Sequence, residues 1–135
     1  MSKLRQKSEF NIEAAKLLIR GTYYASSIHC SYYSCFQLLK YSIKEFFDID
    51  YEKLSVLIST SGMGTHQFII DYVVNEIKRN LSFEDSRMFS RAIKDLKQYR
   101  IDADYNNIEI NMDKGELALS KASEIRDYLK LNFHV

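Results

Sequence analysis

One arginine interrupts an otherwise apolar helix face in the second half of the chain. Residues spaced four, three, four and three positions apart fall on one side of a helix, and here they are Phe89, Ile93, Leu96, Arg100 and Ala103. Only Arg100 is charged. Removing an unpaired guanidinium from water costs several kcal/mol, so an arginine at a core position must be paired or must serve a ligand.

The residues after Arg100 leave two interpretations open. Asp104 follows four positions later, the spacing of a helical ion pair, and Tyr105 stands beside it. In the first interpretation, Arg100 and Asp104 are a structural pair. In the second, Arg100 is the centre of a site for an anion, a nucleotide or an RNA phosphate.

Tyrosines and histidines elsewhere in the chain are the other candidates for chemistry. Tyr32 lies within a long apolar stripe with Tyr33 beside it, and a buried tyrosine needs a partner for its hydroxyl, for which Arg100 or a carboxylate is a candidate. His66 falls in the first turn of a predicted helix, where the helix dipole favours the neutral imidazole. A neutral imidazole can act as a base, or it can be a hydrogen-bonded surface residue. His29 is interpreted as a packed histidine, because single histidines are commonly structural.

Apolar periodicity predicts an all-α, up-and-down bundle of about five helices that forms one domain over residues 1–135. The helices are expected at about residues 8–20, 23–47, 66–80, 83–105 and 112–132. Ser8 is a plausible N-cap of the first, and the second carries the longest apolar stripe and is expected at the centre of the core. The absence of proline and the presence of only four glycines favour long helices.

Residues 48–65 are the least regular part of the chain. Residues 51–58 can add one or two helical turns, and residues 59–65 are small and polar, as in a mobile loop. The two glycines of this loop do not form a phosphate loop, because GxxxxGK[ST] and GxGxxG are both absent.

Composition limits the classes of function. Hydrophobic residues at 46% and charged residues at 27% are ordinary for a soluble globular protein, and the formal net charge of +1 does not by itself indicate a nucleic-acid partner.

Cys30 and Cys35 are five positions apart and point to different helix faces, so reduced thiols and a cytoplasmic location are expected. No secretory signal and no membrane-spanning apolar run is visible.

A local basic stripe is the best candidate for a surface that follows phosphates. It consists of Arg87, Arg91 and Lys94, at steps of four and three on one helix. A solvated helix face is the alternative, because nearby acidic residues dilute its charge. They are Glu84, Asp85 and Asp95.

Three segments together resemble the HEPN superfamily, in its small stand-alone branch. They are residues 21–36 with Tyr32-Tyr33, His66 at the start of a helix, and residues 96–105, which read L-x-x-x-R-x-x-A-D-Y. The resemblance extends from about residue 12 to residue 131. It implies a helical bundle that often forms a homodimer. No cofactor is expected, and no metal site is expected because no Cys/His cluster has zinc-ligand spacing. Many members are metal-independent ribonucleases of toxin–antitoxin or phage-defence systems, and others act beside a small nucleotidyltransferase.

The nuclease members of that superfamily carry a histidine four to six residues after the arginine, and this chain does not. Residues 101–107 contain no histidine, and Tyr105 stands where one is expected. The resemblance therefore implies a non-nucleolytic module that binds a nucleotide, RNA or a partner protein. Its ligand-binding residues would be Arg100, Asp104, Tyr105, Tyr32 and Tyr33.

Two alternatives remain beside this binding module. The first is a divergent metal-independent ribonuclease that uses Arg100 with Tyr105 or His66 as catalytic residues. Tyrosine, with a reference pKa of about 10, is a poor base at neutral pH. The second is a scaffold in which Arg100, Asp104 and the tyrosines only fix the packing of the bundle.

Overall fold

The computed structural model describes residues 3–135, and that part of the chain is built from helices joined by short connections. There are six helices in it: α1 (Lys3–Arg20), α2 (Tyr24–Glu45), α3 (Tyr51–Ser61), α4 (Thr65–Asn80), α5 (Phe83–Tyr105) and α6 (Met112–Phe133). The predicted all-α class is confirmed. The predicted number of about five helices is wrong by one.

The additional helix is α3, in the segment that looked least regular. Its first turn is capped by Asp50, whose carboxylate accepts a hydrogen bond from the backbone N–H of Lys53. It ends at Gly62, which adopts the left-handed conformation with φ of 74°. Leu54 is the buried residue of α3, so the helix has only a small apolar face for periodicity to reveal. The predicted loop at 59–65 is reduced to the three residues before Thr65.

The beginning of α1 also differs from the prediction. Ser8 lies inside the helix rather than at its N-cap, and it is completely buried. Its hydroxyl donates to the backbone carbonyl of Ser34 on α2. A tertiary partner 26 residues away therefore satisfies a serine that local sequence would place at a helix start.

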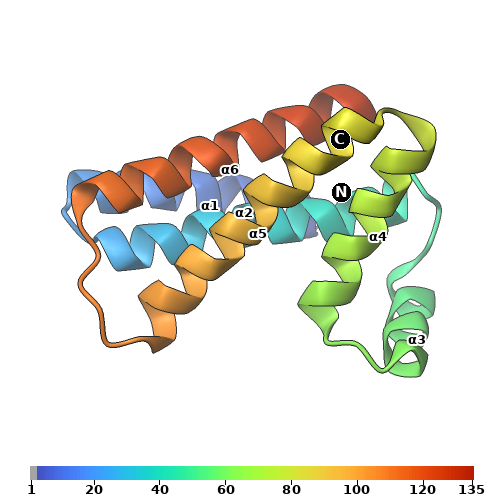
Figure 1. Cartoon of the computed structure of the whole chain (residues 1–135), viewed down its shortest axis with the longest axis horizontal. Helices are drawn as coiled ribbons and strands as arrows, with labels where there is room; N and C mark the ends of the chain where they lie inside the picture. The colour runs from blue at the N-terminus through green and yellow to red at the C-terminus, as the bar shows by residue number, and fades with distance from the viewer. Residues whose placement is uncertain (1–2) are drawn as a thin grey trace.

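Helix α2 lies at the centre of the structure, as predicted. Helices α1, α2 and α6 run roughly along the long axis of the molecule, α5 crosses them obliquely, and α3 lies below α4 at one end (Figure 1). Helix α2 contacts α1, α4, α5 and α6, whereas α3 packs mainly against α4. The buried apolar side chains of α2 are Ile28, Tyr32, Cys35, Phe36, Leu38, Leu39 and Ile43.

Both cysteines are free, as their spacing predicted. Cys35 is buried in the core and Cys30 is partly buried beside it on α2. Burial raises the pKa of the Cys35 thiol to about 12, so it behaves as a small apolar side chain. Within residues 3–135, no helix combines the length and apolarity that crossing a bilayer demands.

Leu39 tests the assignment of α2 as the core helix. We expect Leu39→Ala to lower the free energy of unfolding by about 2–5 kcal/mol, because the fully buried side chain leaves a cavity in the centre of the bundle. Leu131→Ala is the matched control, because Leu131 is 76% exposed, and its effect should stay within about 0.5 kcal/mol. Denaturant unfolding of both variants measures the difference, and equal losses would contradict the assignment.

Candidate functional site

Helix α5 carries Arg100 on its buried face, as the sequence predicted. Arg100 is 7% exposed, and Phe89, Ile93 and Leu96 on the same face are buried. The guanidinium is thus held at the junction of α5 with α2, and it does not extend into bulk water.

Three tyrosine rings surround the Arg100 guanidinium. Its central carbon lies 5.1 Å from the ring centroid of Tyr32, 5.5 Å from that of Tyr33 and 5.7 Å from that of Tyr105. All three distances are within the range of cation–π attraction. Tyr32 and Tyr33 come from α2, whereas Tyr105 ends α5 and is 74% exposed. The structure therefore brings together the arginine and all three tyrosines that the sequence singled out.

The guanidinium of Arg100 has few polar partners for so buried a group. Nη1 lies 3.8 Å from Oδ2 of Asp104, which is close enough for an ion pair but longer than a hydrogen bond. Nε is buried and has no hydrogen-bond partner among the described residues. The Tyr32 hydroxyl is a further hydrogen-bond partner of this guanidinium. A guanidinium offers five N–H donors, so Arg100 still keeps donor capacity that this part of the chain does not fill.

A second buried arginine, Arg126 on α6, shows the contrasting arrangement. It is 3% exposed, and it donates to the hydroxyl of Ser8 and to the carbonyl of Ser34 at 3.4 Å. Its Nη2 lies 2.7 Å from a carboxylate oxygen of Glu9. Arg126 ties α1, α2 and α6 together and is a structural residue.

The sequence analysis missed Arg126, although its signal was of the same kind as that of Arg100. Ala122 lies four positions before it and Leu129 three positions after it, and both line the buried face of α6. The helical spacing alone therefore indicates a buried charge. It does not distinguish a structural arginine from one that serves a ligand.

His66 lies at the first turn of α4, and the hydroxyl of Tyr32 lies 2.6 Å from its Nδ1. Its ring stacks on Phe36 with centroids 4.1 Å apart. Burial lowers the pKa of His66, and the positive charges of Arg100 and Lys97 lower it further. The lowered pKa has the direction expected for a helix N-terminus, and burial is its largest cause.

The same contact indicates which nitrogen of His66 carries the proton. Burial raises the pKa of Tyr32 well above its ordinary value, so its hydroxyl stays protonated. That hydroxyl can donate to Nδ1 of the neutral imidazole, which then holds its hydrogen on Nε2. In this tautomer neither ring nitrogen of His66 is free to accept a proton.

His29 on α2 is the residue whose role the sequence analysis underestimated. Its Nδ1 lies 2.8 Å from Oδ2 of Asp104, and its side chain is about half exposed. A carboxylate accepts only, so Nδ1–H donates to Asp104 and Nε2 is left as the second polar atom of the ring. Asp104 therefore contacts both His29 and Arg100. The two partners of the His29–Asp104 contact lie 75 positions apart, so local spacing carries no signal for it.

A cleft opens beside this cluster, between α2 and α5. It has a volume of about 250 Å³, and His29 and Asp104 line one side of it. Cys30 lies in the same cleft, and the pKa of its thiol is raised by burial and then by the charge of Asp104. The cleft gives a small ligand access to His29 and Asp104, whereas Arg100 is not among the residues that line it.

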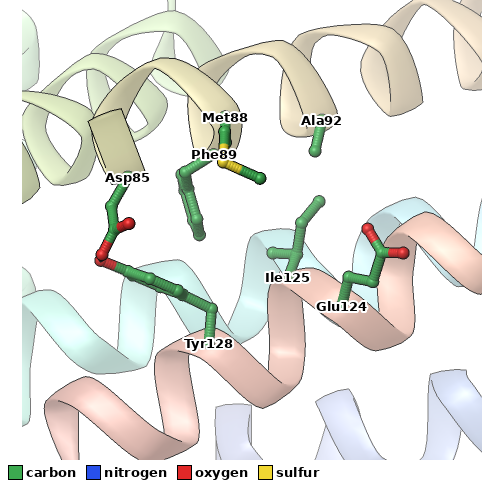
Figure 2. A pocket seen from close by; sticks show the side chains of 7 residues that line it. All are labelled: Asp85, Met88, Phe89, Ala92, Glu124, Ile125 and Tyr128. Atoms are coloured by element: carbon green, nitrogen blue, oxygen red, sulfur yellow. The ribbon is translucent and has the colours of Figure 1, made fainter. Parts of the chain in front are cut away.

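A different pocket, between α5 and α6, is chemically unsuited to an anion. Its walls are mainly apolar, and no basic residue lines it (Figure 2). Asp85 and Tyr128 meet at one end at 3.1 Å, and Glu124 lies at the other (Figure 2). Burial and the Asp85 carboxylate raise the pKa of Tyr128 to about 12. The basic Arg100 cluster, and not this acidic pocket, is therefore the candidate functional site.

Comparison with known proteins gives the family. The family model described as the HEPN domain matches residues 1–132. The chain belongs to the HEPN family. No curated protein and no solved structure matches it. In this HEPN protein Arg100 lies in a cluster with Asp104, His29 and three tyrosines.

The His66 environment predicts a pH dependence of stability. Because the pKa of His66 is lowered in the folded protein, unfolding takes up a proton between that pKa and the ordinary value of histidine. This contribution to the free energy of unfolding is fully present above the ordinary pKa, and it is lost as pH falls through the window. We expect NMR titration to place the pKa of His66 below its ordinary value.

Two variants separate the causes of that shift. Arg100→Met should raise the pKa of His66 only part of the way to its ordinary value, because burial of the ring remains. His66→Gln should remove the corresponding slope from the dependence of unfolding free energy on pH. A His66 that titrates at or above its ordinary value in the wild-type protein would contradict the placement of Arg100 next to it.

Proposed function

We propose that this HEPN protein is a binding module whose ligand is a nucleotide or RNA, held through its phosphate by Arg100. The observation that carries the proposal is the state of the Arg100 guanidinium. It is almost fully buried, yet it has only one ion-pair contact, at 3.8 Å, and its Nε has no partner among the described residues.

Phosphate is the group that suits these free donors. The planar guanidinium presents its N–H groups as a fork that fits two phosphate oxygens, and the low dielectric of a partly buried site strengthens such charge-assisted bonds. Asp104 already balances part of the charge, which lets the guanidinium stay buried without ligand. In contrast, Arg126 donates through Nη1 to Ser8 and Ser34 and forms a close ion pair with Glu9 through Nη2, although Nη2 makes no hydrogen bond of good geometry among the described residues.

The aromatic residues of the cluster favour a ligand with a base. Tyr33 is only partly buried, Tyr105 is 74% exposed, and the ring of His29 lies 4.7 Å from that of Tyr33. Exposed aromatic faces next to a phosphate-binding arginine stack on nucleobases. A nucleotide or a single-stranded RNA therefore matches the cluster better than a simple anion does.

Calorimetric titration with mononucleotides and short single-stranded RNAs tests this proposal. Arg100→Ala should weaken binding by at least about tenfold, because a hydrogen bond to a charged group contributes about 1.5–3 kcal/mol. Arg100→Lys should recover only part of the affinity, because an ammonium lacks the planar fork. Arg79→Ala is the control, since Arg79 is 72% exposed and pairs with Glu76.

Thermal unfolding of the same variants separates a lost ligand contact from a lost fold. A folded Arg100→Ala protein that binds as tightly as wild type would remove Arg100 from the site. A scaffold role for the cluster predicts a different result, namely no measurable nucleotide or RNA binding by the wild-type protein and an Arg100→Met variant at least as stable as wild type.

A second candidate function, metal-independent RNA cleavage, is favoured by the contact between His29 and Asp104. Such cleavage needs a base for the 2′-hydroxyl and a cation for the charge that develops on phosphorus. Arg100 supplies the cation. The Asp104 carboxylate contacts both Arg100 and Nδ1 of His29, and it leaves Nε2 of His29 to accept a proton. From sequence, Tyr105 and His66 were the candidates for this role.

Incubation of the purified protein with total RNA, in the presence of a chelator, tests the cleavage function. Cleavage should be lost in His29→Ala and retained in His66→Gln and Tyr105→Phe. Loss in His66→Gln with retention in His29→Ala would assign the base to His66 instead. RNA that remains intact at high protein concentration would exclude the nuclease and leave the binding module.

The family suggests the setting in which such a module acts. We propose a cytoplasmic protein of a toxin–antitoxin or defence system, with a nucleotidyltransferase as partner protein, that forms a homodimer. Exposed apolar side chains on α1 support self-association, because Phe10 and Leu17 are 64% and 61% exposed. Sedimentation at micromolar concentration should detect the dimer, and a monomer there would count against it.

A further inference from the structure

A groove between α4 and α5 collects basic side chains away from the Arg100 cluster. It has a volume of about 530 Å³. Its charged and aromatic lining residues are Lys78, Phe83, Arg87, Arg91, Lys94 and Asp95. We infer that this groove binds the backbone of a single-stranded nucleic acid, as a surface distinct from the site proposed at Arg100.

The four cations of the groove are not neutralised by protein carboxylates. None of Lys78, Arg87, Arg91 and Lys94 forms an ion pair with any residue in the range 3–135. The one acid of the groove, Asp95, is engaged by Lys121 at 3.6 Å. Four unpaired cations along one groove are a notable concentration in a protein with a formal net charge of +1.

The positive charge is stronger on the α4 side of α5 than on the α6 side. Arg87 and Arg91 also border a hollow of about 280 Å³ toward α6. Lys121 adds a third cation to that hollow, and two acids, Glu84 and Glu124, offset most of this charge. The α4–α5 groove has no such acids beyond Asp95, so a polyanion is directed to it.

An exposed aromatic ring at one end of the groove favours nucleic acid over an acidic peptide. Phe83, at the start of α5, is 58% exposed, and Nζ of Lys78 lies 5.4 Å from its ring centroid. A flat ring next to a cation provides a stacking surface for a base beside a contact for its phosphate. An acidic peptide would use the cations but has no need of the ring.

One more basic residue of α5 follows the groove in the direction of Arg100. Lys94 is followed one turn later by Lys97, whose charge reaches His66, the neighbour of Arg100. From Phe83 to Arg100 the helix is about 25 Å long at about 1.5 Å per residue. The length of the helix therefore allows a strand of several nucleotides to lie along α5 from Phe83 as far as Lys97.

Fluorescence anisotropy with a labelled oligouridylate of about 12 nucleotides, over a range of salt concentrations, tests the groove. The Arg87→Ala/Arg91→Ala double variant should lose at least about tenfold in affinity at low salt. For this variant, a plot of the logarithm of the association constant against the logarithm of the salt concentration should have a slope shallower by about 0.7 for each arginine removed. Phe83→Leu should weaken oligouridylate binding but leave binding of inorganic polyphosphate unchanged.

A control of equal charge makes the test specific. The Arg20→Ala/Arg79→Ala double variant removes two exposed arginines outside the groove, and its affinity should stay within about twofold of wild type. Equal losses in the two double variants would overturn the groove, because the effect would follow net charge alone. Polyglutamate that binds as tightly as the oligonucleotide would overturn a nucleic-acid ligand.

These measurements distinguish the proposed groove from the proposed Arg100 site, because each substitution should weaken a different binding reaction. The groove variant should bind mononucleotides with unchanged affinity, whereas Arg100→Ala should lose mononucleotide binding and keep most of the salt dependence for the oligonucleotide. A groove variant that lost both would show that one site, at Arg100, accounts for all binding and would overturn the second surface.

Discussion

The constraint on which this structure depends is the burial of a permanently charged guanidinium at the junction of α5 and α2. Arg100 cannot lose its proton, so its surroundings must hold the charge. The ring faces of Tyr32 and Tyr33 on α2 stabilise this charge by cation–π contact, and Asp104 stabilises it by a weak ion pair. The aromatic residues of the central helix are therefore part of the site as well as part of the core.

This arrangement links the functional cluster to the packing of three helices. Tyr32 contacts Arg100 of α5 and, through its hydroxyl, His66 at the start of α4. His29, one turn before Tyr33 on α2, contacts Asp104 on α5. A change in how α4 or α5 packs on α2 would thus alter the environment of the guanidinium directly.

Much of the fold and the central residue of the site could be predicted from sequence, because both depend on helical periodicity. The spacing around Arg100 placed it on a buried face, and the stripe of α2 placed that helix at the centre. Periodicity failed at α3, whose buried face is essentially Leu54, and at Ser8, whose partner is on another helix. Periodicity also could not predict the contact of His29 with Asp104, because the two residues are far apart in sequence and meet only in the folded structure.

The two buried arginines show how structure separates roles that sequence leaves open. Both lie on apolar helix faces, and both are less than a tenth exposed. Arg126 donates to Ser8 and Ser34 and pairs with Glu9, so the protein itself uses its donors. Arg100 has aromatic faces, the Tyr32 hydroxyl and a distant carboxylate around it, and its Nε has no partner among the described residues. That difference is the basis for proposing a ligand for Arg100.

The most direct measurement of the central claim is an NMR titration of the arginine Nε–Hε signals with a mononucleotide. If Arg100 binds the phosphate, its signal should shift saturably as nucleotide is added, because its Nε–H has no partner among the described residues. The Arg126 signal should not move, because that equally buried arginine is paired with Glu9 and donates to Ser8 and Ser34. An Arg100 signal that stays in place while the nucleotide demonstrably binds would contradict the account.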